Sequence, residues 1–216
     1  TLRSSGKPLL RGWIHAAAAV AVATFTLVVF SRDNANTERR LPLLIFFASM
    51  CELYTVSAVF HLGIWRKRIY GILRTLDHSS IYIAIASTYT PLCVAALVGW
   101  ARALLLGSAW LLALAGIALT ICAPRLPRAL RTGLYAAMGW MAAPALPAMW
   151  HALPPPATVL MLVGALVYSA GAVIYVRRLP DPLPRILGYH EVFHLCVVAG
   201  SAACAVAICL WVAPLL

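Results

Sequence analysis

Long apolar runs dominate this sequence, and each run is ended by charged or Pro-rich residues. Seven such runs follow one another along the chain, at 12–30, 41–64, 72–98, 103–123, 132–150, 157–176 and 187–216. A helix needs about 20 mostly apolar residues to cross the hydrocarbon core of a bilayer. The pattern therefore predicts an all-α fold, a seven-transmembrane-helix bundle that forms one domain over residues 1–216.

The composition agrees with a protein that is embedded in a membrane. Hydrophobic residues make up 63% of the chain and charged residues only 11%, whereas soluble domains carry about 25% charged residues. Seven spans use about 140 residues, which leaves no room for a second, soluble domain. The six cysteines lie in apolar runs without a C-x-x-C pair, so they are interpreted as small buried apolar residues.

The first and fifth runs differ from a simple apolar span. The first run, 12–30, superficially resembles a signal peptide, but it is too long for the apolar region of one and lacks an A-x-A cleavage pattern. We expect it to be the first span. The fifth run, 132–150, contains Pro144 and Pro147, so we expect a kink there.

The distribution of Lys and Arg predicts how the bundle is oriented. If the N-terminus is cytoplasmic, only Arg32, Arg39, Arg40 and Arg102 of the 17 basic residues fall on the outer side. Short cytoplasmic loops of membrane proteins carry an excess of Lys and Arg. We therefore expect a cytoplasmic N-terminus and an external C-terminus. The net charge of +11 is then a topology signal, and no nucleic-acid partner is expected.

Acidic side chains within the runs are informative, because an Asp or Glu at the centre of a spanning helix costs about 2.5–3.5 kcal/mol. Three of the six acidic residues lie within the apolar runs: Glu52, Asp77 and Glu191. The predicted orientation places Asp77, at the start of the third span, just inside the cytoplasmic face. For Glu52 we favour a structural role, paired with a polar group across the bundle.

Three histidines are predicted to share the membrane depth of Asp77. His61 ends the second run, and His190 and His194 open the seventh, so all three lie near the cytoplasmic face. His190 and His194 are four residues apart and share a helix face. We interpret His15 and His151, which lie near the ends of other runs, as interfacial residues or as residues satisfied by a backbone carbonyl.

Three neutral imidazoles suit Zn²⁺ and leave its fourth position open for water, which is typical of catalytic sites. Such a water becomes more acidic, and a nearby carboxylate can hold it or accept its proton. Asp77 is the predicted carboxylate. Ser57 shares a helix face with His61 and could hydrogen-bond the water or orient a ligand.

The stretch from His190 to His194 also matches H-E-x-x-H, the metalloprotease motif in which Glu191 would act as the general base. That motif needs a third ligand, usually an acid or a histidine further along the chain. Residues 195–216 contain neither, although His61 is available at the same depth. An intramembrane metalloprotease therefore stays as an alternative function.

Several of these motifs together resemble the hemolysin III family of the progestin and adipoQ receptor (PAQR) superfamily. The residues that carry the resemblance are Lys7-Pro8-Leu9-Leu10-Arg11-Gly12-Trp13, Glu52…Ser57-x-x-x-His61, Asp77-His78…Tyr89-Thr90-Pro91, Pro180-Asp181-Pro182 and Gly188-Tyr189-His190-x-x-x-His194. The resemblance implies a seven-helix bundle with zinc held by His61, His190 and His194. It also implies that Asp77 and Ser57 hold the zinc-bound water. The family pattern requires no acid between the last two histidines, which weakens the assignment of Glu191 as a base.

Members of this superfamily and the related alkaline ceramidases are associated with hydrolysis of ceramide-like lipids. The resemblance thus implies an integral membrane zinc protein of the bacterial cytoplasmic membrane that hydrolyses acyl amide bonds, with a membrane lipid as substrate or ligand. A receptor-like or regulatory protein with a structural zinc is the main alternative. A proton or ion pathway stays open, because intramembrane acids often mark one. Haem would leave one histidine unused, and retinal would need a Lys within a span, which this sequence lacks.

Overall fold

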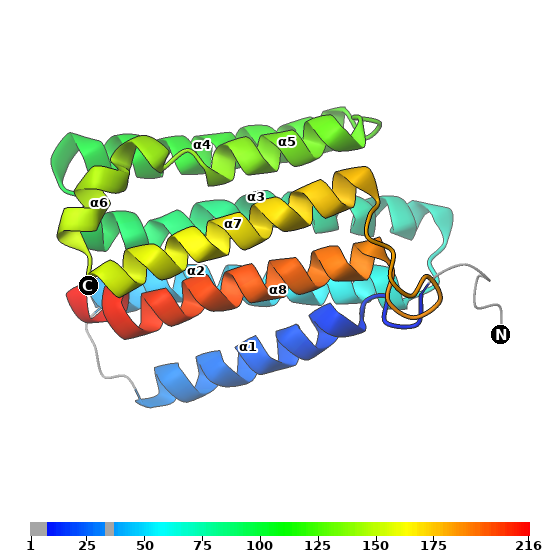
Figure 1. Ribbon diagram of the computed structural model, residues 1–216, viewed down its shortest axis with the longest axis horizontal. Coiled ribbons are helices and arrows are strands. Elements are labelled where there is room, and N and C mark those ends of the chain that lie inside the picture. The colour runs from blue at the N-terminus through cyan, green and yellow to red at the C-terminus, as the bar shows by residue number, and fades with distance from the viewer. Residues whose placement is uncertain (1–7, 33–36) are drawn as a thin grey trace.

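A computed structural model describes residues 8–32 and 37–216, which form an elongated bundle of helices that lie side by side (Figure 1). The helices are α1 Trp13–Arg32, α2 Thr37–Leu62, α3 Lys67–Ala96, α4 Gly99–Cys122, α5 Arg128–Gly139, α6 Leu146–Ala152, α7 Pro155–Arg177 and α8 Tyr189–Ala207. A π-helical turn, Ile208–Val212, and a 3₁₀ turn, Ala213–Leu215, extend α8. The described residues contain no strand, only an isolated bridge between Leu183 and Leu187, and the all-α prediction is confirmed.

Six of the described helices are long and apolar enough to cross a membrane: α1, α2, α3, α4, α7 and α8. They coincide with six of the seven predicted runs. The fifth run is divided instead. The residues of the fifth run form most of α5, a 3₁₀ turn at Ala143–Ala145, and then α6.

Two prolines account for the division of the fifth run. A proline inside a helix removes a backbone donor and collides with the preceding turn, but it fits the first positions of a helix. Pro144 lies in the first positions of the 3₁₀ turn, and Pro147 lies in the first positions of α6. The expected kink is therefore a break between two helices.

Close packing of α7 against α8 depends on glycines. A Cβ atom on Gly171 of α7 would lie 2.7 Å from the Cβ of Cys196, and one on Gly200 of α8 would lie 2.9 Å from the Tyr168 ring. Small residues allow helix backbones to approach closely in membrane proteins. The last helix also contacts α1, so the first and last helices of the bundle are neighbours.

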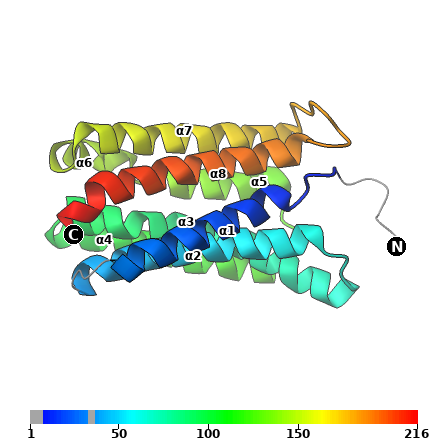
Figure 2. The same cartoon turned by 90° about the horizontal axis from the view of Figure 1, so that it is seen from below.

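One end of the bundle, here called the basic end, collects most of the positive charge. The start of α1, the end of α2 and the starts of α3, α5 and α8 meet there, and the C-terminus lies at the opposite end (Figures 1 and 2). The described basic residues there are Arg11, Arg66, Lys67, Arg68, Arg74, Arg125, Arg128, Arg131, Arg177, Arg178 and Arg185; those at the other end are Arg32, Arg39, Arg40 and Arg102. Arg3 and Lys7, which the charge pattern also assigns to the basic end, lie outside the described residues.

Candidate metal centre

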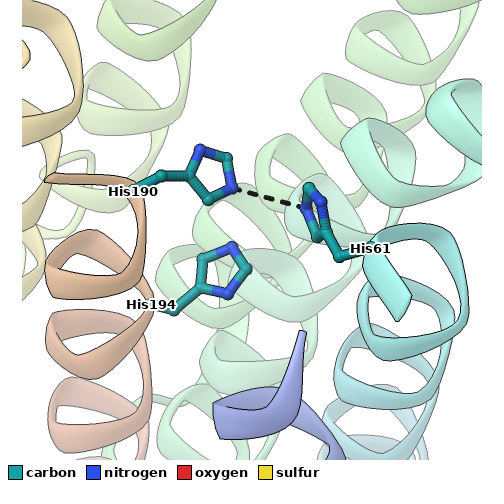
Figure 3. A group of neighbouring side chains, drawn as sticks. All are labelled: His61, His190 and His194. Atoms are coloured by element: carbon teal, nitrogen blue, oxygen red, sulfur yellow. Dashed lines mark hydrogen bonds between the residues drawn. The ribbon is translucent and has the colours of Figure 1, made fainter. Parts of the chain in front are cut away.

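Three histidines from two helices meet at the basic end. His61 lies in the last turn of α2, and His190 and His194 lie in the first turns of α8, with their rings directed toward one another (Figure 3). Their ligating atoms all lie within 4.8 Å of one another, and the Nε2 atoms of His61 and His190 are 3.4 Å apart. The structure thus brings together the three residues that sequence spacing and depth singled out.

One pair of donors has the spacing of zinc ligands. Two nitrogens bound at about 2.05 Å to a tetrahedral zinc lie about 3.4 Å apart, which is the separation of His61 Nε2 from His190 Nε2. His194 is only 2% exposed, and its Nδ1 has no hydrogen-bond partner among the described residues. A buried polar atom without a partner is costly. We therefore interpret the His194 ring as part of a site in which a metal ion and the groups around it would bind the two ring nitrogens.

Glu191 fixes the start of α8, and so the positions of both histidines on that helix. It is fully buried, its Oε2 accepts a hydrogen bond from the Gly188 amide at 2.9 Å, and its Oε1 pairs with Arg11. The segment that carries Arg11 is itself bound to the loop before α8, because the amides of Leu9 and Leu10 donate to the carbonyls of Arg185 and Ile186.

These contacts leave Glu191 without a free oxygen for catalysis. One carboxylate oxygen caps the helix and the other neutralises Arg11. A general base must be within reach of the proton that it removes. The H-E-x-x-H match therefore provides two histidines for the cluster but supplies no base.

Asp77 and Ser57, the predicted holders of the water, lie together. Ser57, one turn before His61, is within hydrogen-bonding reach of the Asp77 carboxyl group. The neighbouring His78 is occupied elsewhere, because its Nδ1 lies 2.6 Å from the carbonyl oxygen of Arg74.

Ser57, His61, Asp77, His190 and His194 all line one cavity of about 700 Å³. Every helix except α4 contributes to its wall. The cavity is polar at the basic end and continues past apolar side chains to Met149, Leu153 and Thr158, near the other end of the bundle.

Comparison with protein-family models matches residues 4–205 to the family described as Haemolysin-III related. The chain belongs to this family. A Hemolysin-3 homolog of Bacillus subtilis (strain 168) is 33% identical over 82% of this chain and 80% of its own length. A Hemolysin-3 of Bacillus cereus is 30% identical over 89% and 84%. With its six long apolar helices, this haemolysin III-related chain is an integral membrane protein.

A plant relative is also similar to most of the chain. The Heptahelical transmembrane protein ADIPOR2 of Oryza sativa subsp. japonica is 28% identical over 78% of this chain and 81% of its own length. The resemblance to the hemolysin III family within the PAQR superfamily is therefore confirmed.

His15 also lies beside the histidine cluster, a position that the sequence did not lead us to expect. It is 3% exposed, and its ring stacks on that of His194 at a centroid distance of 3.9 Å and an angle of 3°. Because the ring is buried, the expectation of an interfacial residue was wrong, whereas a hydrogen bond to the His194 backbone fits the other expectation, a histidine satisfied by the backbone. The depth argument applied to His61 would have found it, because α1 also begins at the basic end. His151, by contrast, is exposed near the opposite end.

We expect Glu191→Gln to lower the thermal stability of this haemolysin III-related protein while leaving the three histidines in place. The amide can still cap α8, but it leaves the partly buried Arg11 charge unpaired, and breaking a buried ion pair costs about 3–5 kcal/mol. The measurement is the unfolding midpoint in detergent. Asp181→Asn is the control, because Asp181 accepts only an exposed hydrogen bond from the Tyr189 amide. Equal midpoints for the two variants would contradict a stabilising role for the ion pair.

Proposed function

We propose that this protein is a zinc-dependent hydrolase that cleaves acyl amide bonds of ceramide-like membrane lipids. The observation that carries the proposal is the single cavity shared by the three histidines, Asp77, Ser57 and a long apolar extension. A metal site at the polar end of an apolar cavity can meet the carbonyl group of a lipid whose acyl chain fills the remainder.

The proposal includes the membrane topology. We take α5 and α6 together, residues 128–152, as one span, which gives seven spans with the six long helices. The basic end then faces the cytoplasm, in accordance with the excess of Lys and Arg there. The rice relative carries the word heptahelical in its name, and the Bacillus relatives support a bacterial cytoplasmic membrane.

In the proposed reaction, His61, His190 and His194 hold the zinc, which when bound polarises the carbonyl group and makes water more acidic. Asp77 accepts a proton from the attacking water and passes it to the departing nitrogen. Ser57 keeps the Asp77 carboxyl group oriented through their hydrogen bond. Water oxygen becomes bonded to the carbonyl carbon as the C–N bond breaks, so the products are a fatty acid and an amine.

The length of the cavity suits one long acyl chain. Along α7 its wall runs from Thr158 to Tyr175, which corresponds to about 25 Å of helix. An extended hydrocarbon chain advances about 1.25 Å per carbon, given C–C bonds near 1.5 Å. A chain of about 16 to 18 carbons, about 20–22 Å long by the same geometry, therefore fits between the histidines and the far end.

The test of this function supplies metal-replete protein in bilayers with a panel of ceramides and other acyl lipids and measures free fatty acid. We expect release by the wild type and by His151→Ala, which changes an exposed histidine near the opposite end of the bundle from the three clustered histidines. His190→Ala should release none. If the wild type releases no more than His190→Ala across the panel, the receptor-like or structural-zinc function should replace the hydrolase.

A further inference from the structure

The polar end of the cavity carries an excess of positive charge that the proposed hydrolysis does not use. Five arginines line it: Arg11, Arg74, Arg128, Arg131 and Arg178. Of these, Arg11 is neutralised by Glu191. The other four form no ion pair with any carboxylate in the described part of the chain.

Arg131 of α5 is the most deeply buried of these side chains, at 7% exposed. Its Nη2 donates to the carbonyls of Pro124 and Leu126 at 3.2 and 3.4 Å, whereas its Nε is buried and has no partner among the described residues. Burying a charge is costly unless it is paired and hydrogen-bonded. A cavity-facing guanidinium with an unused donor is therefore suited to a bound anion.

Arg128 brings a second positive charge close to the metal centre. Its guanidinium carbon lies 4.8 Å from the centre of the Tyr175 ring, and its Nη1 donates to the Tyr175 carbonyl at 3.2 Å. The Tyr175 ring in turn lies 5.6 Å from the ring of His190. Arg128 is thus separated from a predicted zinc ligand by one aromatic ring.

Membrane topology alone does not explain where these arginines point. The excess of Lys and Arg in cytoplasmic loops depends on the side of the membrane and not on burial. Arg125 and Arg185 serve that purpose at the same end of the bundle while exposed on the surface. Arg74, Arg128 and Arg131 instead face the interior of the cavity.

We propose that Arg74, Arg128 and Arg131 bind a carboxylate or phosphate on the amine side of the acyl amide substrate, an inference that rests on the proposed hydrolase function. The acyl chain occupies the apolar length of the cavity, the amide carbonyl lies at the three histidines, and the short head group extends to the arginines. Guanidinium groups match the planar geometry of carboxylates and the oxygens of phosphates. The preferred substrate is then an anionic acyl amide rather than a neutral ceramide.

Binding tests the inference without catalysis. Hexadecyl phosphate, palmitate and hexadecanol carry the same chain with an anionic or a neutral head, and inorganic phosphate carries the anion without a chain. For the wild type we expect both anionic lipids to bind at least about tenfold more tightly than the alcohol, and inorganic phosphate to bind weakly. Tight binding of inorganic phosphate alone would assign the site to a soluble anion and overturn the lipid proposal.

Variants separate the arginines from the metal as the source of this preference. Arg74→Gln and Arg128→Gln should each reduce the preference for the anion about tenfold, and Arg125→Gln is the matched surface control that should leave it unchanged. If removing the positive charge of Arg131 prevents folding, Arg131→Lys is the variant to use, because it keeps that charge. The preference should persist in His190→Ala, which lacks a metal ligand. If it disappears there but survives in both arginine variants, the metal binds the anion and the inference is wrong.

A matched pair of substrates separates this inference from the proposed function. N-palmitoylglycine and N-palmitoylethanolamine differ in carrying a carboxylate or a hydroxyl group near the amide. We expect the wild type to prefer N-palmitoylglycine about tenfold in kcat/KM, and Arg128→Gln to lose that preference. Cleavage of only the neutral amide would keep the hydrolase and overturn the anionic substrate. If neither is cleaved although the anionic lipids bind selectively, the hydrolase fails and the arginines remain an anion site.

Discussion

Replacing His61 by Ala should lower bound zinc from about one ion per chain to less than about a tenth of that after dialysis, because three protein ligands define such a site. His190→Ala and His194→Ala should have the same effect, since each removes one of the three clustered imidazoles. Elemental analysis of the purified protein gives the measurement. His151→Ala controls for loss of any histidine, because this residue is exposed near the opposite end of the bundle. Full zinc occupancy in His61→Ala would contradict the three-histidine assignment.

Changing Asp77 to Asn should leave the fold and most of the zinc intact while lowering lipid hydrolysis about 10²- to 10⁴-fold, the usual contribution of a positioned acid or base. The amide has nearly the same shape and can still form hydrogen bonds, but it cannot accept the proton of water. The measurements are zinc content and fatty-acid release on the same preparation.

Ser57→Ala is the matched comparison for Asp77. The substitution removes a hydrogen bond to the Asp77 carboxyl group but leaves that group in place as the proton acceptor. Hydrolysis should therefore fall less than in Asp77→Asn. Undiminished turnover in Asp77→Asn would exclude Asp77 as the base. If Glu191→Gln abolished turnover instead, with α8 still intact, the metalloprotease alternative would regain its base.

Much of the fold could be predicted from hydropathy, because each helix that crosses a bilayer must be long and apolar on its own. The six long helices follow that rule. The fifth run also contains enough apolar residues, but hydropathy does not report backbone geometry. Pro144 and Pro147 begin new helical turns there, so the run contains two shorter helices.

The clustering of the three histidines could be predicted because residues at the same depth in a narrow bundle are brought close together. His61, His190 and His194 share a depth, and the bundle is narrow enough to bring them into contact. Depth says nothing about which direction a side chain faces around its helix. Depth would have placed His15 near the cluster, but its stacking on His194 and the burial of Arg131 in the cavity both depend on that direction and could not be predicted.

The pairing of Arg11 with Glu191 has a consequence for how the protein is made. The two residues are 180 positions apart in the chain, and His61 and His190 are 129 apart. Synthesis at about 5–20 residues per second delivers His190 to the membrane about 6–26 seconds after His61. Until α8 enters, Glu191 is not beside Arg11, and neither His190 nor His194 is beside His61. If the three histidines bind zinc as proposed, capture of the metal is a late event in biogenesis, because only a chain whose last helix has been inserted beside its first brings all three ligands together.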